Sequence, residues 1–279
     1  VWNVRQGAGS SSRSSLTLGA TLADRLSLGS RVVVEAGLRA EAVTGSAAGS
    51  AQEVSWQSLL PHASAQIRLS RRGGGSVFGG YTRLADRLLL DYLAVGDPAA
   101  PTAVVSRWNT QPDVLSFTAL GAPVARVGPG TGGDPAFSAI DAGLRRPVTD
   151  EFIVGLESKP GNAWLFRFTG VARRQTPLLG LVNVGVPTAG NYDTFTVADP
   201  AGNVLDPADD RTLTVFDRRP GSFGRDRYLL TNPAQEPLDF KGLEVNVGYT
   251  TPRVSFIVGG TAGMATGTAA SRGFGPLEN

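Results

Sequence analysis

The chain has 279 residues, enough for one large domain or two ordinary ones. Its formal net charge of +2 argues against nucleic acid as a partner. It contains no cysteine, which excludes a disulfide framework, a thiolate metal site and a cysteine nucleophile.

Apolar and polar residues alternate along most of the chain, and helical periodicity is scarce. Around Lys159-Pro160-Gly161-Asn162, two such runs flank turn residues, which is typical of a β-hairpin. The same pattern recurs, and it predicts an all-β fold with about eight strands in four hairpins. The predicted strands are 13–26, 31–44, 62–71, 76–87, the two arms of the hairpin in 149–174, 239–250 and 253–266.

The connections between these strands fall into two classes. Within hairpins they are short, whereas between hairpins they are longer and cover 45–61, 88–146 and 177–238. In an up-and-down antiparallel meander, all short turns lie at one end and all long loops at the other. Transmembrane β-barrels of the bacterial outer membrane have this asymmetry, with short periplasmic turns and long extracellular loops.

Strand length favours the same interpretation. The runs are longer than the ~5–6 residues common in soluble sheets, and a tilted strand needs about 9–11 residues to cross a bilayer. A soluble sandwich with apolar residues inside is the alternative that alternation alone leaves open. For a barrel, we expect apolar residues to face lipid, with Trp164 and Tyr249 near the periplasmic interface. The polar side chains expected to face the lumen include Glu35, Arg39, Arg68, Glu157, Arg167 and Glu244.

Face assignment also predicts the turns, because directly opposed residues share a face. In the hairpin around Gly161, even-numbered positions are apolar in both strands, so the loop holds an odd number of residues. We expect Leu156 opposite Trp164 and Val154 opposite Phe166, with a loop at 159–161. The same argument predicts loops at 27–29, 72–74 and 250–253, and a positive φ at Gly29, Gly74 and Gly161.

Several stretches resemble the barrel of TonB-dependent receptors, in particular the Oar-like branch that often carries a carboxypeptidase-regulatory-like domain. They are "LTLGATLADRLSLGSRVVVEAGLRAE" (16–41), "LRRPVTDEFIVGLE" (144–157), "WLFRFTGVARR" (164–174), "LVNVGVP" (181–187), "FGRDRYLLTNP" (223–233) and "FKGLEVNVGY" (240–249). The resemblance implies a 22-stranded barrel filled by an N-terminal plug that an inner-membrane TonB complex acts on. The plug, the energy-coupling box and the last strands are not recognisable here. We therefore expect 1–279 to be an internal barrel fragment.

The two longest loops carry aromatic and arginine residues, the types that anchor ligands and partners. The candidate contacts to an extracellular ligand are Arg107, Trp108, Tyr192, Arg218, Arg219, Arg227 and Tyr228. The arginine pairs there could meet an acidic substrate or lipopolysaccharide phosphates. The alternative is that these side chains only fold the loops over the barrel mouth.

Recognisable catalytic or cofactor chemistry is sparse. His62 is the only histidine and lies in no catalytic motif, so we expect no enzyme activity. The run "GPGTGG" (128–133) lacks the ending of a phosphate-binding loop, and we expect a flexible loop segment there. The acidic stretch 199–210 offers calcium ligands without the spacing of a calcium loop, so turn formation explains it better. Its candidate ligands are Asp199, Asn203, Asp206, Asp209 and Asp210. We expect no cofactor.

Together these patterns predict a barrel in the bacterial outer membrane, in contact with lipid. The resemblance implies that it takes up an unidentified substrate in a TonB-dependent manner. A surface adhesion or secretion-related barrel without transport is the alternative.

Overall fold

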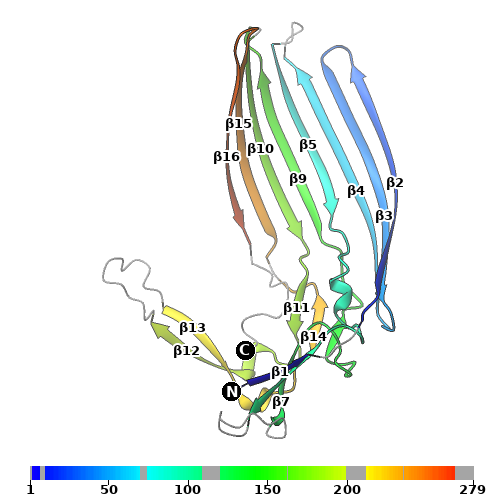
Figure 1. The fold of residues 1–279 in the computed structure, drawn as a ribbon. Helices are drawn as coiled ribbons and strands as arrows, with labels where there is room; N and C mark the ends of the chain where they lie inside the picture. Colours follow the sequence, from blue (N-terminus) through cyan, green and yellow to red (C-terminus); the bar gives the residue numbers. More distant parts are fainter. Residues whose placement is uncertain are drawn as a thin grey trace.

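The computed structural model describes residues 2–6, 10–69, 74–108, 120–161, 163–198, 212–234 and 236–267. Its main feature is one antiparallel sheet of eight strands, in the order β16-β15-β10-β9-β5-β4-β3-β2 (Figure 1). This confirms the all-β fold and the meander of four hairpins. The strands are β2 (Arg13–Leu28), β3 (Val32–Ala47), β4 (Glu53–Arg68), β5 (Gly75–Ala85), β9 (Val148–Ser158), β10 (Trp164–Thr176), β15 (Leu238–Thr250) and β16 (Ser255–Thr266).

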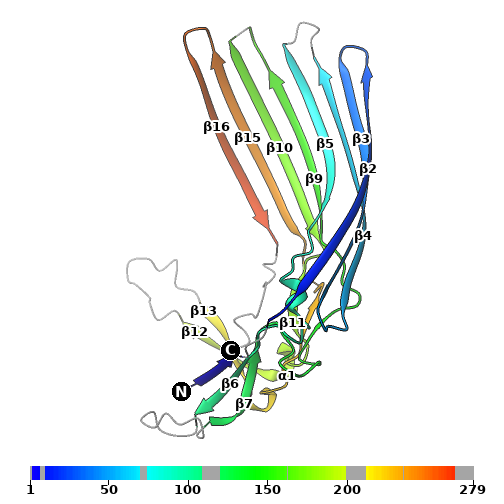
Figure 2. The same ribbon diagram turned by 45° about the vertical axis from the view of Figure 1, so that its right-hand side comes forward.

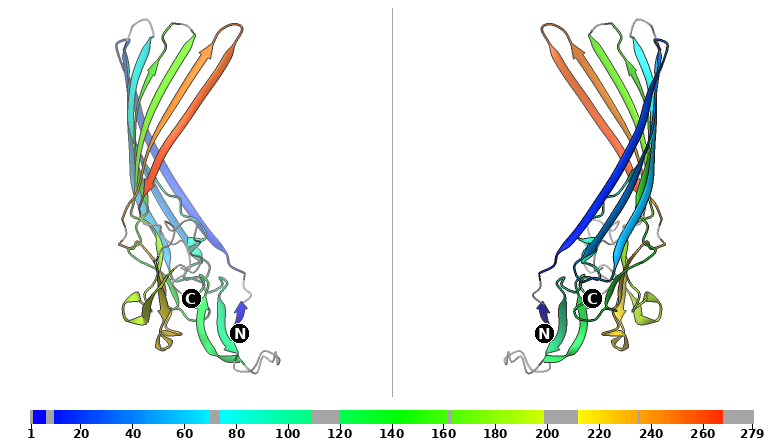
Figure 3. Two further views of the ribbon diagram at one scale, coloured as in Figure 1. Left: turned by 90° about the vertical axis from the view of Figure 1, so that its left-hand side faces the viewer. Right: turned by 90° about the vertical axis from the view of Figure 1, so that its right-hand side faces the viewer.

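The sheet is open and twisted. Within the described residues, the edge strands β2 and β16 each pair with one neighbour only. Seen from the side, these two strands cross at a wide angle, as the right-handed twist of β-sheets requires (Figure 3). Both edges therefore present unpaired backbone groups along a long strand.

The four hairpin turns lie together at one end of the sheet, and the longer connections form a lobe at the other end (Figures 1 and 2). This arrangement agrees with the predicted asymmetry of connections. We call the two the turn end and the lobe end.

The connection predicted over 45–61 is wrong. β3 continues to Ala47 and β4 begins at Glu53, so only 48–52 joins them. Val43, Ala47, Val54 and Trp56 are buried, while their neighbours along the strands are more exposed. The alternation therefore continues through 43–56, but here the apolar side chains lie on the side of the sheet that carries Arg39 and Glu41, where the lobe covers them.

The lobe is built from the two longest connections, which are rich in structure. β8 (Ser138–Ile140) comes from the first connection, and β11 (Gly180–Asn183) and β14 (Tyr228–Thr231) from the second. β14 pairs with β11 antiparallel and with β8 parallel, so one small sheet joins both connections. Further lobe elements are β1 (Trp2–Gln6), η1 (Tyr92–Ala94), β6 (Ala103–Trp108), β7 (Leu120–Val127), α1 (Thr188–Asn191), β12 (Tyr192–Ala198), β13 (Thr212–Arg218) and η3 (Pro220–Ser222).

A hydrophobic core lies where the lobe meets the end of the sheet. Trp56 is buried there, and its indole N–H donates to the Leu144 carbonyl oxygen over 2.8 Å. The segment 128–133, expected to be flexible, packs against 96–102 in the same region, and the Thr131 N–H donates to the Asp97 carbonyl. The buried core residues are Val43, Val54, Trp56, Leu88, Leu93, Val95, Ile140, Leu144 and Leu230.

The predicted side of the sheet is confirmed for the residues of each strand. The predicted pairing between neighbouring strands is wrong, because it is shifted along the chain. Leu156 lies opposite Phe168 and Val154 opposite Gly170, instead of Trp164 and Phe166. Each opposed pair still shares a face, because the shift is an even number of residues. The loops lie at 29–31, between Arg68 and Ser76, between Ser158 and Phe166, and at 251–254.

Two of the three predicted left-handed glycines are confirmed. Gly29 has φ 64° and Gly161 has φ 68°. Gly74 does not have a positive φ, so that prediction is wrong. The loop after β4 begins at Leu69, earlier than predicted, so Gly74 lies next to the start of β5 and not at the turn position that needs a left-handed residue.

Candidate functional site

One face of the sheet is apolar across all eight strands, and we call it the apolar face. A single cross-strand row runs Leu28, Val32, Ile67, Val77, Leu156, Phe168, Val245 and Gly260. Large side chains on this face lie open, with Leu22 81% and Val258 63% exposed. Soluble monomers rarely expose apolar patches above a few hundred Å², and larger ones mark membrane or protein contacts.

Aromatic side chains gather on the apolar face near the turn end. Trp164 lies directly opposite Tyr249, and Tyr249 directly opposite Phe256. Their ring centroids are 4.7 Å apart for the first pair and 5.5 Å apart for the second. The prediction that Trp164 and Tyr249 share the apolar face is therefore confirmed, and they form one cluster.

Charged side chains gather on the apolar face near the lobe end. Arg83, Asp150, Arg174 and Asp239 lie opposite one another on β5, β9, β10 and β15, so charges alternate along one row. Arg83 holds Asp150 through two hydrogen bonds of 2.7 and 2.9 Å. The Tyr81 hydroxyl also donates to Asp150, and its ring lies 4.9 Å from that of Phe152. We call Arg83, Asp150, Arg174 and Asp239 the charged row.

The distance between the aromatic cluster and the charged row can be measured along β10. Trp164 and Arg174 are ten residues apart, about 33 Å along a strand that rises ~3.3 Å per residue. For a strand tilted by about 40°, the height becomes about 25 Å, the height of the lipid-facing band in membrane barrels. On the edge strand β2, Asp24 is a charged exception within the apolar face.

The opposite face is polar and concave, and we call it the polar face. A hollow of about 830 Å³ lies on it, lined by Glu35, Glu157, Arg167 and Glu244 of the predicted lumen-facing set. Arg68 lies in the same cross-strand row as Glu157 and Arg167. Arg39 lies nearer the lobe and pairs with Glu41 at 2.6 Å. The other charged lining residues are Arg25 and Glu151, beside His62.

Two rings on the polar face lie directly over glycines. The position of a Cβ on Gly155 would be 2.2 Å from the Phe78 ring, and on Gly37 it would be 2.2 Å from the His62 ring. Arg167 in turn stacks over Phe78, with 5.0 Å between the guanidinium carbon and the ring centroid. A residue with a Cβ at either position would have to displace the ring, and at Gly155 the Cβ would also lie 2.7 Å from the Phe168 carbonyl oxygen.

Two buried ionic networks attach the lobe to the sheet. In the first, the Arg146 guanidinium pairs with Glu41 of β3 at 2.8 Å and donates to the Asp86 carbonyl and the Ser58 hydroxyl. Arg146 and Glu41 side chains are 6% and 9% exposed. This network connects Arg146 and Asp86 of the lobe to Glu41 of β3 and Ser58 of β4, on the polar face of the sheet.

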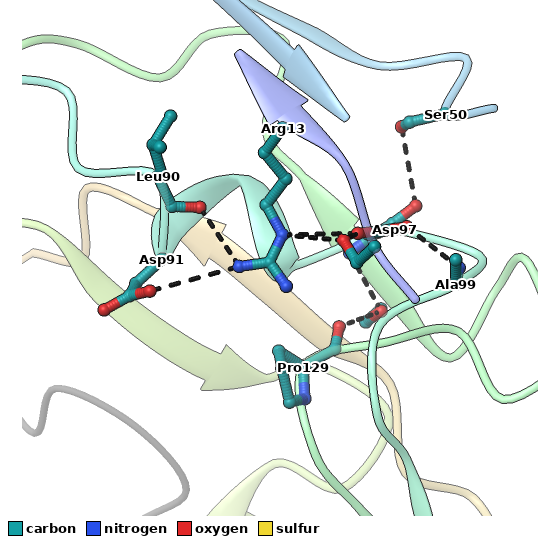
Figure 4. A network of polar contacts seen from close by, with 10 residues as sticks. Arg13, Ser50, Leu90, Asp91, Asp97, Ala99 and Pro129 are labelled. Atoms are coloured by element: carbon teal, nitrogen blue, oxygen red, sulfur yellow. Dashed lines mark hydrogen bonds and ion pairs between the residues drawn. The ribbon is translucent and has the colours of Figure 1, made fainter. Parts of the chain in front are cut away.

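In the second network, Asp97 is fully buried and binds the start of β2 (Figure 4). Its carboxylate accepts hydrogen bonds from the Ser11 hydroxyl, from Arg13 Nε at 3.3 Å and from the Ala99 N–H at 2.8 Å. Arg13 also donates to the Leu90 carbonyl at 3.4 Å. The first long connection is thus held against the lobe end of β2.

Three of the seven predicted ligand-contact residues are buried inside the lobe. Tyr192, Arg218 and Tyr228 are buried. Arg218 pairs with Asp226 at 2.7 Å and donates to Ser222, and Tyr228 packs edge-on against Phe137. These contacts support the alternative given above, in which the side chains fold the loops.

The other predicted contacts differ in exposure. Arg219 is exposed and pairs with Asp193 at 2.6 Å, and this carboxylate raises the pKa of Arg219 above its ordinary value. Arg227 is exposed. β6 contains Arg107 and Trp108, but their side chains lie outside the described part. Asp199, Asn203, Asp206, Asp209 and Asp210, the possible calcium ligands, also lie outside it.

The described residues contain neither a metal-binding cluster nor a helix that could span a membrane. No group of three or more His, Asp or Glu side chains there is arranged to hold a metal ion. His62 faces Glu35, with 4.0 Å between Nε2 and the carboxylate oxygen. In the same part of the chain, no helix has the length and apolarity to cross a membrane.

Sequence reasoning missed the charged row, because its residues come from four strands and become neighbours only through the register. It also missed Arg146, Glu41 and Asp97, which look like ordinary surface charges in the sequence. The chain matches no protein-family model and no curated protein.

Proposed function

We propose that the chain forms part of the wall of an outer-membrane β-barrel that takes up a substrate from outside the cell. The observation that carries this proposal is the apolar face, continuous over eight strands and bounded by the aromatic cluster and the charged row. Its height of about 25 Å matches the hydrocarbon contact of a membrane barrel.

The two faces together support a membrane wall better than a soluble sandwich. In a sandwich, the apolar face would be covered by a second sheet about 10 Å away. Here Leu22, Val154, Leu243 and Val258 are each more than half exposed on that face. Lipid would cover these side chains, and the polar face would border a water-filled or plugged lumen.

The open edges support a larger assembly. β2 and β16 leave unpaired backbone groups, and a membrane cannot satisfy such groups with water. We therefore propose that further strands complete the barrel. Coupling to an inner-membrane TonB complex, through a plug inside that barrel, is the energy source proposed for uptake.

Spin labels test the membrane placement, and the absence of native cysteine makes single-cysteine variants simple to interpret. Labels would be placed at Leu243, Val245 and Val247 and at the alternate positions Glu244, Asn246 and Gly248. In reconstituted bilayers, we expect the first set to collide more with oxygen, which concentrates in lipid. The second set should collide more with a water-soluble nickel chelate. Equal accessibility at odd and even positions would refute the barrel wall.

Uptake itself needs a separate test, because adhesion is the second candidate function. The folded lobe favours adhesion as an alternative, since it offers an ordered surface at one end of the sheet. Cells with and without the intact protein would be compared for accumulation of a panel of labelled small nutrients. Accumulation that depends on the protein and stops with a protonophore supports energised uptake. Surface attachment that persists with the protonophore, without accumulation, supports adhesion.

A further inference from the structure

The charged row contains two cations and two carboxylates, but its four side chains are not equally well paired. Asp150 has both carboxylate oxygens engaged by Arg83, and Tyr81 donates to one of them. It therefore has little capacity left for Arg174, its other neighbour in the row. Arg174 pairs instead with Asp239, at 3.9 Å.

A second cation lies beside Arg174. Lys241 is on the apolar face of β15, opposite Ala172, and Arg174 is opposite Asp239. Arg174 and Lys241 are thus diagonal neighbours on adjacent strands, at backbone positions about 7–8 Å apart, a spacing that long side chains can bridge. Both cations can therefore reach one small anion. Lys241 is exposed and forms no ion pair within the described residues. With Asp239 as the single shared carboxylate, this pair keeps a net charge of about +1.

The surroundings of this pair are apolar on one side. Met264, 63% exposed, lies opposite Lys241, and Leu243 is the next residue on the same face. A lysine at the edge of an apolar band lays its aliphatic stem along the band and extends its ammonium group to the boundary. An anion bound here would therefore sit at the boundary, directly above hydrocarbon.

We propose that Arg174 and Lys241 bind the phosphate of an anionic membrane lipid, whose acyl chains lie along the apolar face. This inference rests on the proposed function, because it requires lipid against that face. A free phosphate would satisfy the charge alone. The apolar neighbours favour a ligand that carries hydrocarbon chains next to its phosphate, so the lipid is the proposed occupant.

The test measures lipid binding to the intact protein by native mass spectrometry. Dioleoyl-phosphatidylglycerol and dioleoyl-phosphatidylcholine are titrated from mixed micelles, and their affinities are compared. We expect the anionic lipid to bind more tightly. Arg174→Gln and Lys241→Gln should each weaken it about 5-fold and the double variant about 25-fold, the effect of one cation near an anionic membrane surface.

The matched control is the double variant Arg68→Gln and Arg167→Gln, which removes the same charge from the polar face. It should leave lipid binding unchanged, and Lys241→Arg should preserve it. Equal affinity for both lipids, or equal loss in the control, would overturn the site. Full displacement by millimolar inorganic phosphate would overturn the lipid assignment in favour of a free anion.

Flotation of the same protein with vesicles of phosphatidylcholine alone separates this inference from the proposed function. If the protein floats with these vesicles but binds both lipids equally in the titration, only the proposed phosphate site is overturned. Failure to float with any vesicle overturns the membrane wall and the phosphate site together.

Discussion

The eight-stranded sheet and the lobe differ in how much of their apolar side-chain surface is buried. The lobe and the end of the sheet beside it bury Trp56, Leu93 and Leu230 in a shared core. The sheet between the lobe and the turns leaves Leu22, Val154 and Val258 exposed. A protein gains most of its stability from apolar burial, so the sheet must obtain it from its surroundings. The lobe is therefore expected to be stable in water, and the sheet only in a bilayer.

The largest expected effect is in the lobe core. Trp56→Ala should lower the free energy of unfolding by about 3–5 kcal/mol, the usual cost of emptying a buried tryptophan site. Leu59→Ala, on the same strand but 62% exposed on the apolar face, is the control and should cost far less in detergent. Urea unfolding followed by tryptophan fluorescence measures both. Equal costs would mean that the core between the lobe and the sheet does not stabilise the protein.

The next effect contrasts the two faces of β15. In a bilayer, Val245→Arg should cost about 2–4 kcal/mol, because it places a charge against hydrocarbon. Asn246→Arg should cost much less, since Asn246 lines the polar hollow. Folding into vesicles of phosphatidylcholine, titrated with urea, gives both values. Similar costs on both faces would contradict the assignment of one face to lipid.

The attachment of the lobe to β2 can be broken at Asp97. Asp97→Asn should cost about 1–3 kcal/mol, because the buried charge-assisted bonds to Arg13 and Ser11 are weakened. Asp91 also faces Arg13, at 3.9 Å, but its side chain is 97% exposed, so Asp91→Asn should change little. Limited proteolysis of 86–102, followed over time, reports detachment of this segment. If both variants are cleaved at the same rate, the network does not hold the lobe.

A smaller effect is expected in the turns. Gly161→Ala should cost about 1–2 kcal/mol, because φ 68° is unfavourable for a residue with a Cβ. Gly74→Ala should be neutral or slightly stabilising, since Gly74 has no positive φ and has open space at its Cβ position. Thermal unfolding in detergent compares the two. A cost at Gly74 as large as at Gly161 would refute the observed turn.

The smallest effect is a pH dependence confined to the lobe. The Thr231 hydroxyl and the Gly143 N–H donate to Asp141 and hold the pKa of its carboxyl below the ordinary value of 3.8. A lowered pKa in the folded state stabilises the protein above about pH 4, and this stability is lost as the pH falls through the lower folded pKa. Asp141→Asn should remove this part of the acid dependence. Urea midpoints of the two proteins, measured from about pH 5 downwards, should converge at low pH.

The sequence by itself determined the face of each strand. Alternation with period two assigns Phe166, Val245 and Val154 to one side whatever the register, because an even shift leaves every side chain on its face. It also determined Gly29 and Gly161, whose turns need residues without a Cβ penalty. The eight strands and the separation of short turns from long connections follow from the same pattern.

Only the tertiary structure decided the exact pairing and the lobe. The sequence does not show that Leu156 meets Phe168 instead of Trp164, because hydrogen bonding to both neighbouring strands sets the register. It does not show that 43–56 stays in the sheet, because burial there comes from Leu88, Leu93 and Leu144, distant along the chain. Tyr192, Arg218 and Tyr228 look like ligand contacts in the sequence, and packing against distant segments buries them. The charged row likewise forms only when four strands bring Arg83, Asp150, Arg174 and Asp239 together.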